Sequence, residues 1–245
     1  MVFFRFAIAL VVGLGSLMAQ GQSSPTPAKP LSLEERGDLF MVHKQYREAI
    51  EAYGQGPKDN ATIWNKTGIA WHQLGQLDKA KADYERSVKL KPDYAAAHNN
   101  LGAVYYARKS YRRAISAYKK AIELTPQSAS FHKNLGTAYF ARKQDVLSMQ
   151  EYQEAFRLDP DVFENRSPFG TALEDSTVAD RARYHYNLAK IYAKASQNDL
   201  AIQYLKKALE EGFHDKKKLE QDPEFQAMRD LPEFKQLLAS EPRVL

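Results

Sequence analysis

The feature that most constrains the fold of this 245-residue chain is an internal period of 34 residues. Three blocks, which start at Ala61, Ala95 and Ala129, align without a gap. Small residues recur at places 8, 20 and 27 of each block, aromatic residues at places 11 and 24, and proline at place 32. These residues are Gly68, Gly102 and Gly136; Trp71, Tyr105 and Tyr139; Ala80, Ala114 and Ser148; Tyr84, Tyr118 and Tyr152; Ser87, Ala121 and Ala155; Pro92, Pro126 and Pro160. A period of this length is typical of stacked structural repeats, each of which buries its apolar face against its neighbours.

Each block is predicted to be a pair of helices. Places 4, 7, 8 and 11 are apolar or small at helical spacing, and so are places 20, 24 and 27. The small residues at places 8 and 20 allow close approach of the two backbones, while the large rings fill the space toward the next pair. Tyr105 and Tyr139 are therefore expected to be buried, and the loss of either ring to cost about 3 to 5 kcal/mol.

At these six places the chain resembles the tetratricopeptide-repeat family, in which glycine, tyrosine, alanine and proline stand in the same order. The resemblance implies an all-α fold, a right-handed α-solenoid of antiparallel helix pairs with about five repeats and a C-terminal capping helix segment. The predicted parts are a signal peptide (1–20), a flexible leader (21–30), an atypical first repeat (31–60), repeats at 61–94, 95–128 and 129–162, an insertion loop (163–181), a repeat (182–215) and capping helices (216–245).

The second half of the chain departs from the period. The insertion at 163–181 carries Pro168 and Gly170 and is either a functional lid or a surface excursion. The repeat at 182–215 has Phe213 where proline would stand. Near the C-terminus, Pro223 and Pro232 each open a short predicted helix that seals the last apolar face.

The first twenty residues have the order of a secretory signal. Arg5 precedes an apolar run that starts at Phe6, and the small residue Ala19 marks a cleavage site. The run is shorter than the roughly 20 residues that span a bilayer, which favours cleavage over an uncleaved anchor. We therefore expect an exported protein in the periplasm or outside the cell. The absence of cysteine excludes disulfides, thiolate metal sites and thiol nucleophiles.

The sequence contains no motif that indicates catalysis. Phosphate-binding loops, serine elbows and zinc helices are absent, and the carboxylates are scattered, so we expect neither an enzyme nor a cofactor. His98, His132 and His185 share place 4, but equivalent places in stacked helix pairs lie on the order of 10 Å apart. A shared metal needs each ligand within about 2 Å, so half-buried packing rings are expected instead. The net charge of +5 is mild and interspersed, and the basic pairs, such as Arg108–Lys109, are expected on solvated faces without nucleic acid.

Places 2, 5, 6, 9, 12 and 13 are expected to line the concave wall, the usual binding surface of a solenoid. The asparagines at place 6 can grip the backbone of an extended peptide, because a primary amide both donates and accepts. Asparagine is also common at this place in the family, so both interpretations stay open. The basic residues of this wall favour an acidic ligand, although Ile69 and Ala96 depart from the family's carboxylate clamp. The candidate peptide-binding residues are Asn65, Lys66, Asn99, Asn100, Tyr106, Lys133, Asn134, Phe140, Arg183, Asn187 and Lys190.

The sequence therefore predicts an exported scaffold that binds a protein or peptide segment in its concave groove. Two alternative functions remain open. One is a structural or oligomerising subunit that uses its outer faces, and the other is an accessory module that regulates an exported enzyme. The oligomeric state is not predicted.

Overall fold

The computed structural model describes residues 30–164 and 177–239 of the chain. The predicted signal, almost all of the leader and most of the insertion lie outside these residues. Two compact units divide the chain, Met1–Leu31 and Ser32–Leu245, and the description that follows concerns the second. Every regular element among the described residues is a helix, which confirms the predicted all-α solenoid.

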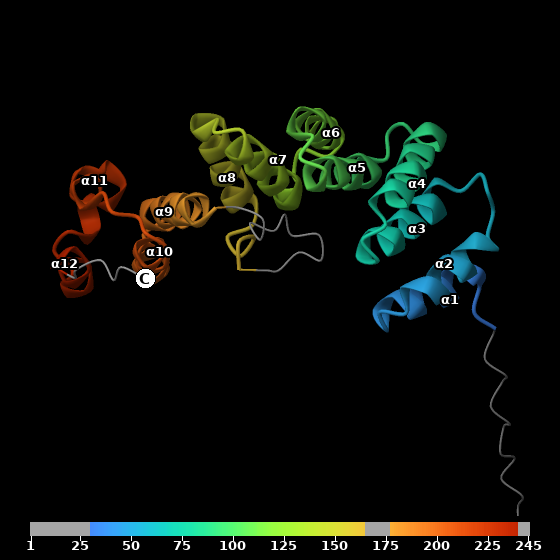
Figure 1. Cartoon of the computed structure of the whole chain (residues 1–245), viewed down its shortest axis with the longest axis horizontal. Helices are drawn as coiled ribbons and strands as arrows, with labels where there is room; N and C mark the ends of the chain where they lie inside the picture. The colour runs from blue at the N-terminus through green and yellow to red at the C-terminus, as the bar shows by residue number, and fades with distance from the viewer. Residues whose placement is uncertain (1–29, 165–176, 240–245) are drawn as a thin grey trace, which may run out of the picture. The chain divides into compact units, whose positions relative to one another are not determined.

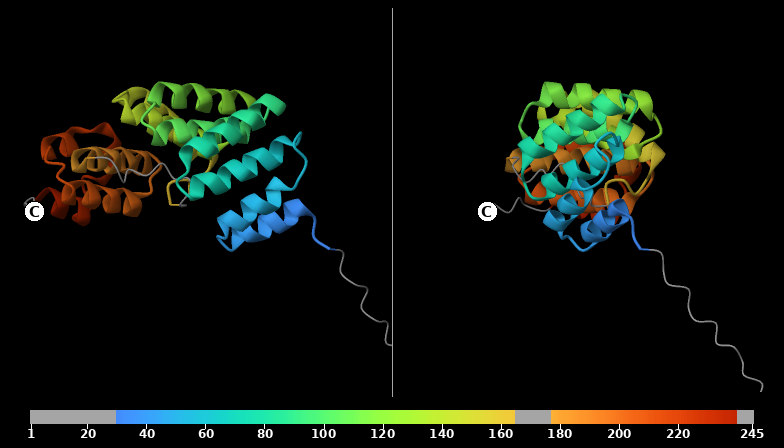
Figure 2. Two further views of the ribbon diagram at one scale, coloured as in Figure 1. Left: turned by 45° about the vertical axis from the view of Figure 1, so that its right-hand side comes forward. Right: turned by 90° about the vertical axis from the view of Figure 1, so that its right-hand side faces the viewer.

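Ten helices form five consecutive pairs (Figure 1). They are α1 (Leu33–Val42) with α2 (Tyr46–Gly54), α3 (Ala61–Gln73) with α4 (Leu77–Leu90), α5 (Ala95–Ala107) with α6 (Tyr111–Leu124), α7 (Ala129–Ala141) with α8 (Asp145–Leu158), and α9 (Val178–Lys194) with α10 (Asn198–Glu210). The two helices of a pair run side by side, as Figure 2 shows, and each pair contacts the next. None of the described helices is long and apolar enough to cross a membrane.

A tight turn joins the two helices of each pair. One residue of this turn has a left-handed backbone in all five pairs, and only Gly75 (φ 70°) is a glycine. The others are Lys44, Lys109, Lys143 and Ser196, with φ between 56° and 60°. Because side chains disfavour this conformation, the packing of the pair holds the turn in place.

Inside each pair a glycine of the first helix lies against a tyrosine ring of the second. A Cβ atom added to Gly102 would stand 2.6 Å from the ring of Tyr118, and the same contact recurs between Gly68 and Tyr84, between Gly136 and Tyr152, and between Gly37 and Tyr53. These four rings are at most 1% exposed. The last pair has Ala189 in place of the glycine and Leu205 in place of the tyrosine, and both are fully buried. The extra methyl group of alanine is thus accommodated by a side chain smaller than tyrosine.

Of the two place-11 tyrosines that were expected to be buried, only one is. Tyr139 is 6% exposed, but Tyr105 is half-buried, and its hydroxyl donates to Glu85 at 3.4 Å. Arg113 lies over the same ring at 5.9 Å. This ring reaches the edge of the pair, where charged groups cover it, so the stability cost expected above is too large for Tyr105.

The two ends of the stack differ. At the C-terminal end, α11 (Lys216–Gln221), the 3-10 helix η2 (Pro223–Met228) and α12 (Pro232–Ala239) follow the last pair. Phe225, Met228 and Phe234 of this segment are fully buried in the cluster that contains Leu205. At the N-terminal end α1 leaves Leu39 47% and Val42 77% exposed.

Replacement of Gly102 by alanine is expected to lower the free energy of unfolding by about 1 to 3 kcal/mol, because the new methyl group overlaps a ring that is fully buried. Gly54→Ala is the matched control, since a methyl group there meets no atom within 4 Å. That variant should be neutral or more stable by up to about 1 kcal/mol. Urea denaturation monitored by circular dichroism measures both.

The second substitution Tyr118→Leu should restore part of the loss in Gly102→Ala, as the Ala189–Leu205 pair does. A double-mutant cycle with coupling below about 0.5 kcal/mol would contradict this packing.

Candidate functional site

A ladder of buried amides connects the first helices of successive pairs. Asn100 Nδ2 donates to Asn65 Oδ1 at 3.0 Å, and Asn134 Nδ2 donates to Asn99 Oδ1 at 2.9 Å. Asn99 Nδ2 and Asn100 Oδ1 are 3.4 Å apart, so all four amides form one network. Their exposed fractions are 4 to 9%. The side chain at place 6 of one repeat thus bonds the side chain at place 5 of the repeat before it. These asparagines were candidate peptide-binding residues, and the structure shows them bonded to one another instead.

Lys66 forms the first rung of the same ladder. Its Nζ lies 2.7 Å from both Glu34 and Asp38 of α1. Burial disfavours the ammonium, but the hydrogen bonds to Asp38 and Glu34 outweigh it and raise the pKa of Lys66. Its charge is therefore neutralised within the chain.

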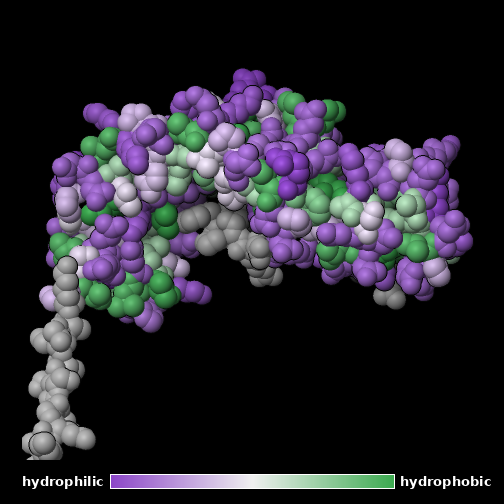
Figure 3. Space-filling view, turned by 180° about the vertical axis from the view of Figure 1, so that it is seen from behind, coloured by the Kyte–Doolittle hydropathy of each residue, from purple (hydrophilic) through white to green (hydrophobic). Residues whose placement is uncertain are grey.

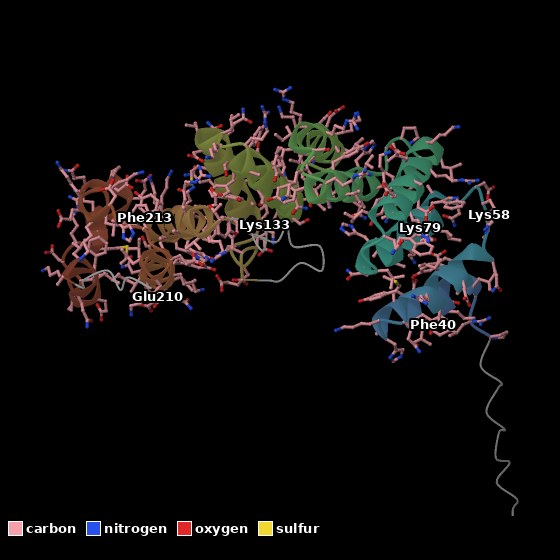
Figure 4. The ribbon with its side chains drawn as sticks, in the orientation of Figure 1. Phe40, Lys58, Lys79, Lys133, Glu210 and Phe213 are labelled. Atoms are coloured by element: carbon pink, nitrogen blue, oxygen red, sulfur yellow. The ribbon has the colours of Figure 1, made fainter. Side chains whose placement is uncertain are left out.

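The ladder ends at Asn187. In the preceding repeat, place 5 is Lys133, whose Nζ donates to the backbone oxygen of Val162 at 2.7 Å (labelled in Figure 4). Burial lowers the pKa of Lys133, and Asp159 acts in the opposite direction. Within residues 30–164 and 177–239 the side chain of Asn187 has no hydrogen-bond partner, although it is only 9% exposed.

Asn187 borders a cavity of 660 Å³ between α8, α9 and the turn that links α10 to α11. The candidate residues Arg183 and Lys190 line it as well. Its wall exposes more apolar than polar surface. The other lining residues are Asp145, Val146, Met149, Gln150, Ala179, Ala182, Tyr186, Gly212, Phe213, His214, Asp215 and Lys218.

Tyr186 is the largest buried side chain of this wall that carries a polar group. Its ring stacks on Phe213, with centroids 4.4 Å apart and planes 13° apart, and is 3% exposed (Figure 4 labels Phe213). Its hydroxyl is buried and meets no hydrogen-bond partner in the part of the chain that the structure describes. Two adjacent residues of one cavity wall, Tyr186 and Asn187, thus have side-chain polar groups that bond no described residue, and of the two only the Tyr186 hydroxyl is buried.

The cations of the cavity wall are mostly paired inside the chain. Arg183 bonds Asp145 at 2.5 Å and Asp180 at 3.2 Å. Lys190 lies 3.2 Å from Asp222 and 3.3 Å from Glu224. Burial and the neighbouring Glu224 raise the pKa of Asp222 to about 6. The positive wall inferred from the sequence is thus largely neutralised.

Lys218 differs from those cations. It makes no ion pair with any described residue and lies 5.1 Å from the Tyr186 ring. It is therefore the lining cation that remains available to a ligand.

Two other candidate residues lie away from the cavity. Phe140 is 2% exposed, with Arg183 over its ring at 4.1 Å and Tyr184 against its edge at 6.0 Å, so it packs inside the stack. Tyr106 contacts Tyr111 at 5.3 Å. The candidate set therefore separates into the ladder, the cavity and these packing residues.

The histidines at place 4 bond to neighbouring repeat elements. His98 Nε2 lies 2.8 Å from the oxygen of Pro92, and His132 Nε2 lies 3.1 Å from that of Pro126. His185 Nδ1 lies 2.6 Å from Glu211. No group of three metal-binding side chains is present among the described residues.

Reasoning from the sequence missed half of the cavity wall. It considered only the first helix of each pair, whereas Asp145, Val146 and Met149 come from a second helix and His214 and Asp215 from a turn. One signal was present in the sequence, because Phe213 replaces the usual proline.

Comparison with known proteins identifies the repeats. Models described as TPR repeat match residues 68–108 and 102–143, and a tetratricopeptide-repeat model matches residues 182–211. The chain is 32% identical over 89 residues to the tetratricopeptide repeat domain-containing protein PYG7, chloroplastic, of Arabidopsis thaliana, which covers 34% of this chain and 30% of that protein. The match to the small glutamine-rich tetratricopeptide repeat-containing protein 2 of Mycosarcoma maydis is 32% identical over 77 residues, or 30% of this chain and 22% of that protein. The chain thus spans less than a third of the length of either relative.

Solved structures share the fold. One crystal structure of MamA superimposes with a TM-score of 0.51 at 22% identity over 75% of this chain and 96% of MamA. A second gives a TM-score of 0.52 at 22% identity over 78% and 93%. Tetratricopeptide repeats are thus confirmed over residues 68–143 and 182–211, and repeats of this type mediate protein–protein interaction and are generally non-enzymatic.

The ladder and the cavity predict effects of different size for two asparagine substitutions on stability. Asn100→Ala should lower the free energy of unfolding by about 1 to 3 kcal/mol, because the oxygen of Asn65 loses its donor in a buried place. Asn187→Ala should change it by less than about 0.5 kcal/mol, since no bond to the described residues is lost. Chemical denaturation distinguishes the two, and equal losses would contradict the different roles.

Proposed function

We propose that this tetratricopeptide-repeat solenoid is a non-catalytic scaffold that holds an extended segment of a partner protein in the cavity between α8, α9 and the α10–α11 turn. The observation that carries the proposal is that Tyr186 and Asn187, adjacent on one cavity wall, have side chains that bond no residue described by the structure. The hydroxyl of Tyr186 is buried, and a buried polar group without a partner costs about 1 to 3 kcal/mol. A ligand that bonds this hydroxyl recovers that cost, and the amide of Asn187 offers the ligand a further donor and acceptor.

The chemistry of the wall fits a peptide. The amide of Asn187 can donate to a backbone carbonyl and accept from a backbone N–H, independently of the ligand's sequence. Val146, which is 74% exposed, offers apolar surface beside Met149 and Phe213 for one side chain of the ligand. The volume of 660 Å³ lies in the range of about 300 to 1,000 Å³ that is usual for binding pockets.

Export is part of the proposal. The order of Arg5, the apolar run and Ala19 supports a secretory signal, and a chain without cysteine tolerates an oxidising compartment. The partner is accordingly a protein of the periplasm or the extracellular medium. Because Arg183 and Lys190 are already paired, an acidic ligand is favoured only beside Lys218.

Selection from a random peptide library, followed by calorimetric titration of a selected peptide, tests the site. Asn187→Ala should weaken binding about tenfold or more, which corresponds to about 1.4 kcal/mol. Tyr186→Phe removes one hydroxyl without changing the ring and should weaken it several-fold. The matched control is Asn198→Ala, because Asn198 is a half-buried asparagine that does not line the cavity.

If Asn187→Ala and Asn198→Ala bind the peptide with equal affinity, the cavity is not the binding site. Failure to select any peptide that the wild-type chain binds would also count against the proposal. In both cases the interaction surface lies elsewhere on the stack.

A further inference from the structure

Place 10 of each repeat is a stacking position. It holds Ala70, Val104, Ala138 and Ile191 in the four later repeats, and these residues are 0 to 3% exposed. Val104 belongs to one cluster with Ala80 and Tyr84 of the preceding pair, and Ala138 clusters with Ala114 and Tyr118 in the same way. The preceding helix pair therefore covers place 10.

In the first repeat, place 10 is Leu39, which is 47% exposed, and Val42 one turn later is 77% exposed. Figure 3 shows hydrophobic surface gathered over the α1–α2 end of the stack. Terminal repeats normally carry a polar outer face, as solubility requires. Here the first repeat keeps the apolar stacking position, and no helix pair of the described residues covers it, which is typical of an interaction surface.

We infer that a second copy of this chain covers this end, with α1 of one copy antiparallel to α1 of the other. The charges on α1 and the turn that follows it are self-complementary. Glu35 lies in the first turn of α1, whereas His43, Lys44 and Arg47 follow its end and form no ion pair with any described residue. An antiparallel arrangement brings the acidic end of each helix to the basic end of the other, so the attraction occurs twice.

Alignment on Leu39 makes this geometry specific. With the two-fold axis at Leu39, residue 35 of one copy lies opposite residue 43 of the other, so Glu35 faces His43 across the interface. The leucines meet each other at the centre of the interface. An interface of this kind is isologous and closes as a dimer.

Other occupants fit this end less well. A head-to-tail stack requires an open C-terminal face, but Phe225, Met228 and Phe234 already seal that face. The leader at 21–30, GQSSPTPAKP, contains no large apolar residue that could replace a helix pair. A second copy of α1 covers Leu39 and Val42 with apolar surface and places charges of opposite sign at both ends of the helix.

Disulfide trapping tests the inference directly, because the natural chain has no cysteine. In the full chain, Leu39→Cys should form a covalent dimer under mild oxidation, since a two-fold axis at this residue brings the two Cα atoms within the roughly 4.4 to 6.8 Å that a disulfide needs. Leu90→Cys is the matched control, because Leu90 is a leucine of similar exposure, 41%, on α4. It should stay monomeric under the same conditions.

The second measurement is the molar mass of the full chain, obtained by light scattering during size-exclusion chromatography. The wild-type chain should have twice the mass of one chain, while Leu39→Glu should be monomeric with an unchanged circular dichroism spectrum and an unchanged affinity for a cavity-binding peptide. A wild-type mass of one chain at every concentration, or equal cross-linking of the two cysteine variants, would overturn the inference. The dimer and the peptide site are thus tested independently.

Discussion

The contact between a glycine and a tyrosine ring inside each helix pair fixes the spacing on which the other contacts depend. Without a side chain at Gly102, the first helix can approach Tyr118 closely enough for the ring to be fully enclosed. Because the same contact recurs every 34 residues from Gly68 to Gly136, the three central pairs present equivalent faces to one another. Where the last pair changes this contact to Ala189 and Leu205, both partners change together.

Regular pairs bring place 6 of one repeat beside place 5 of the one before, and this produces the amide ladder. The amides of the ladder join neighbouring repeats and are not available to a ligand, because they are buried and already bond one another. The ladder stops where Lys133 occupies place 5 and bonds the backbone oxygen of Val162, the residue before the insertion. Asn187 has no partner there among residues 30–164 and 177–239, and it lies beside the cavity. The candidate site therefore lies where the repeat pattern is interrupted.

Local and periodic features were predictable from the sequence. Helical spacing and the recurring proline predicted paired helices, and α3, α5 and α7 begin at the first residues of the three aligned blocks. Lateral relations between repeats were not predictable from spacing alone. The partners of the asparagines, the neutralisation of Lys66 and the half-exposure of Tyr105 depend on how side chains of different repeats meet in space. The structure also starts α9 at Val178, four residues before the predicted repeat, where Thr177 accepts a hydrogen bond from the backbone N–H of Asp180 and caps the helix.

The interruption of the ladder at Asn187 also affects how the stack opens. In a solenoid, stability is approximately a sum of repeat terms and nearest-neighbour terms, so a missing rung weakens the coupling at one junction. The pairs from α1 to α8 share polar rungs, whereas no rung joins α7 to α9 among the described residues. Other contacts hold this junction, because Arg183 of α9 bonds Asp145 of α8 and Tyr184 of α9 packs against Phe140 of α7. A partner that bonds Asn187 would supply the missing rung and strengthen the coupling between the repeats on either side of it.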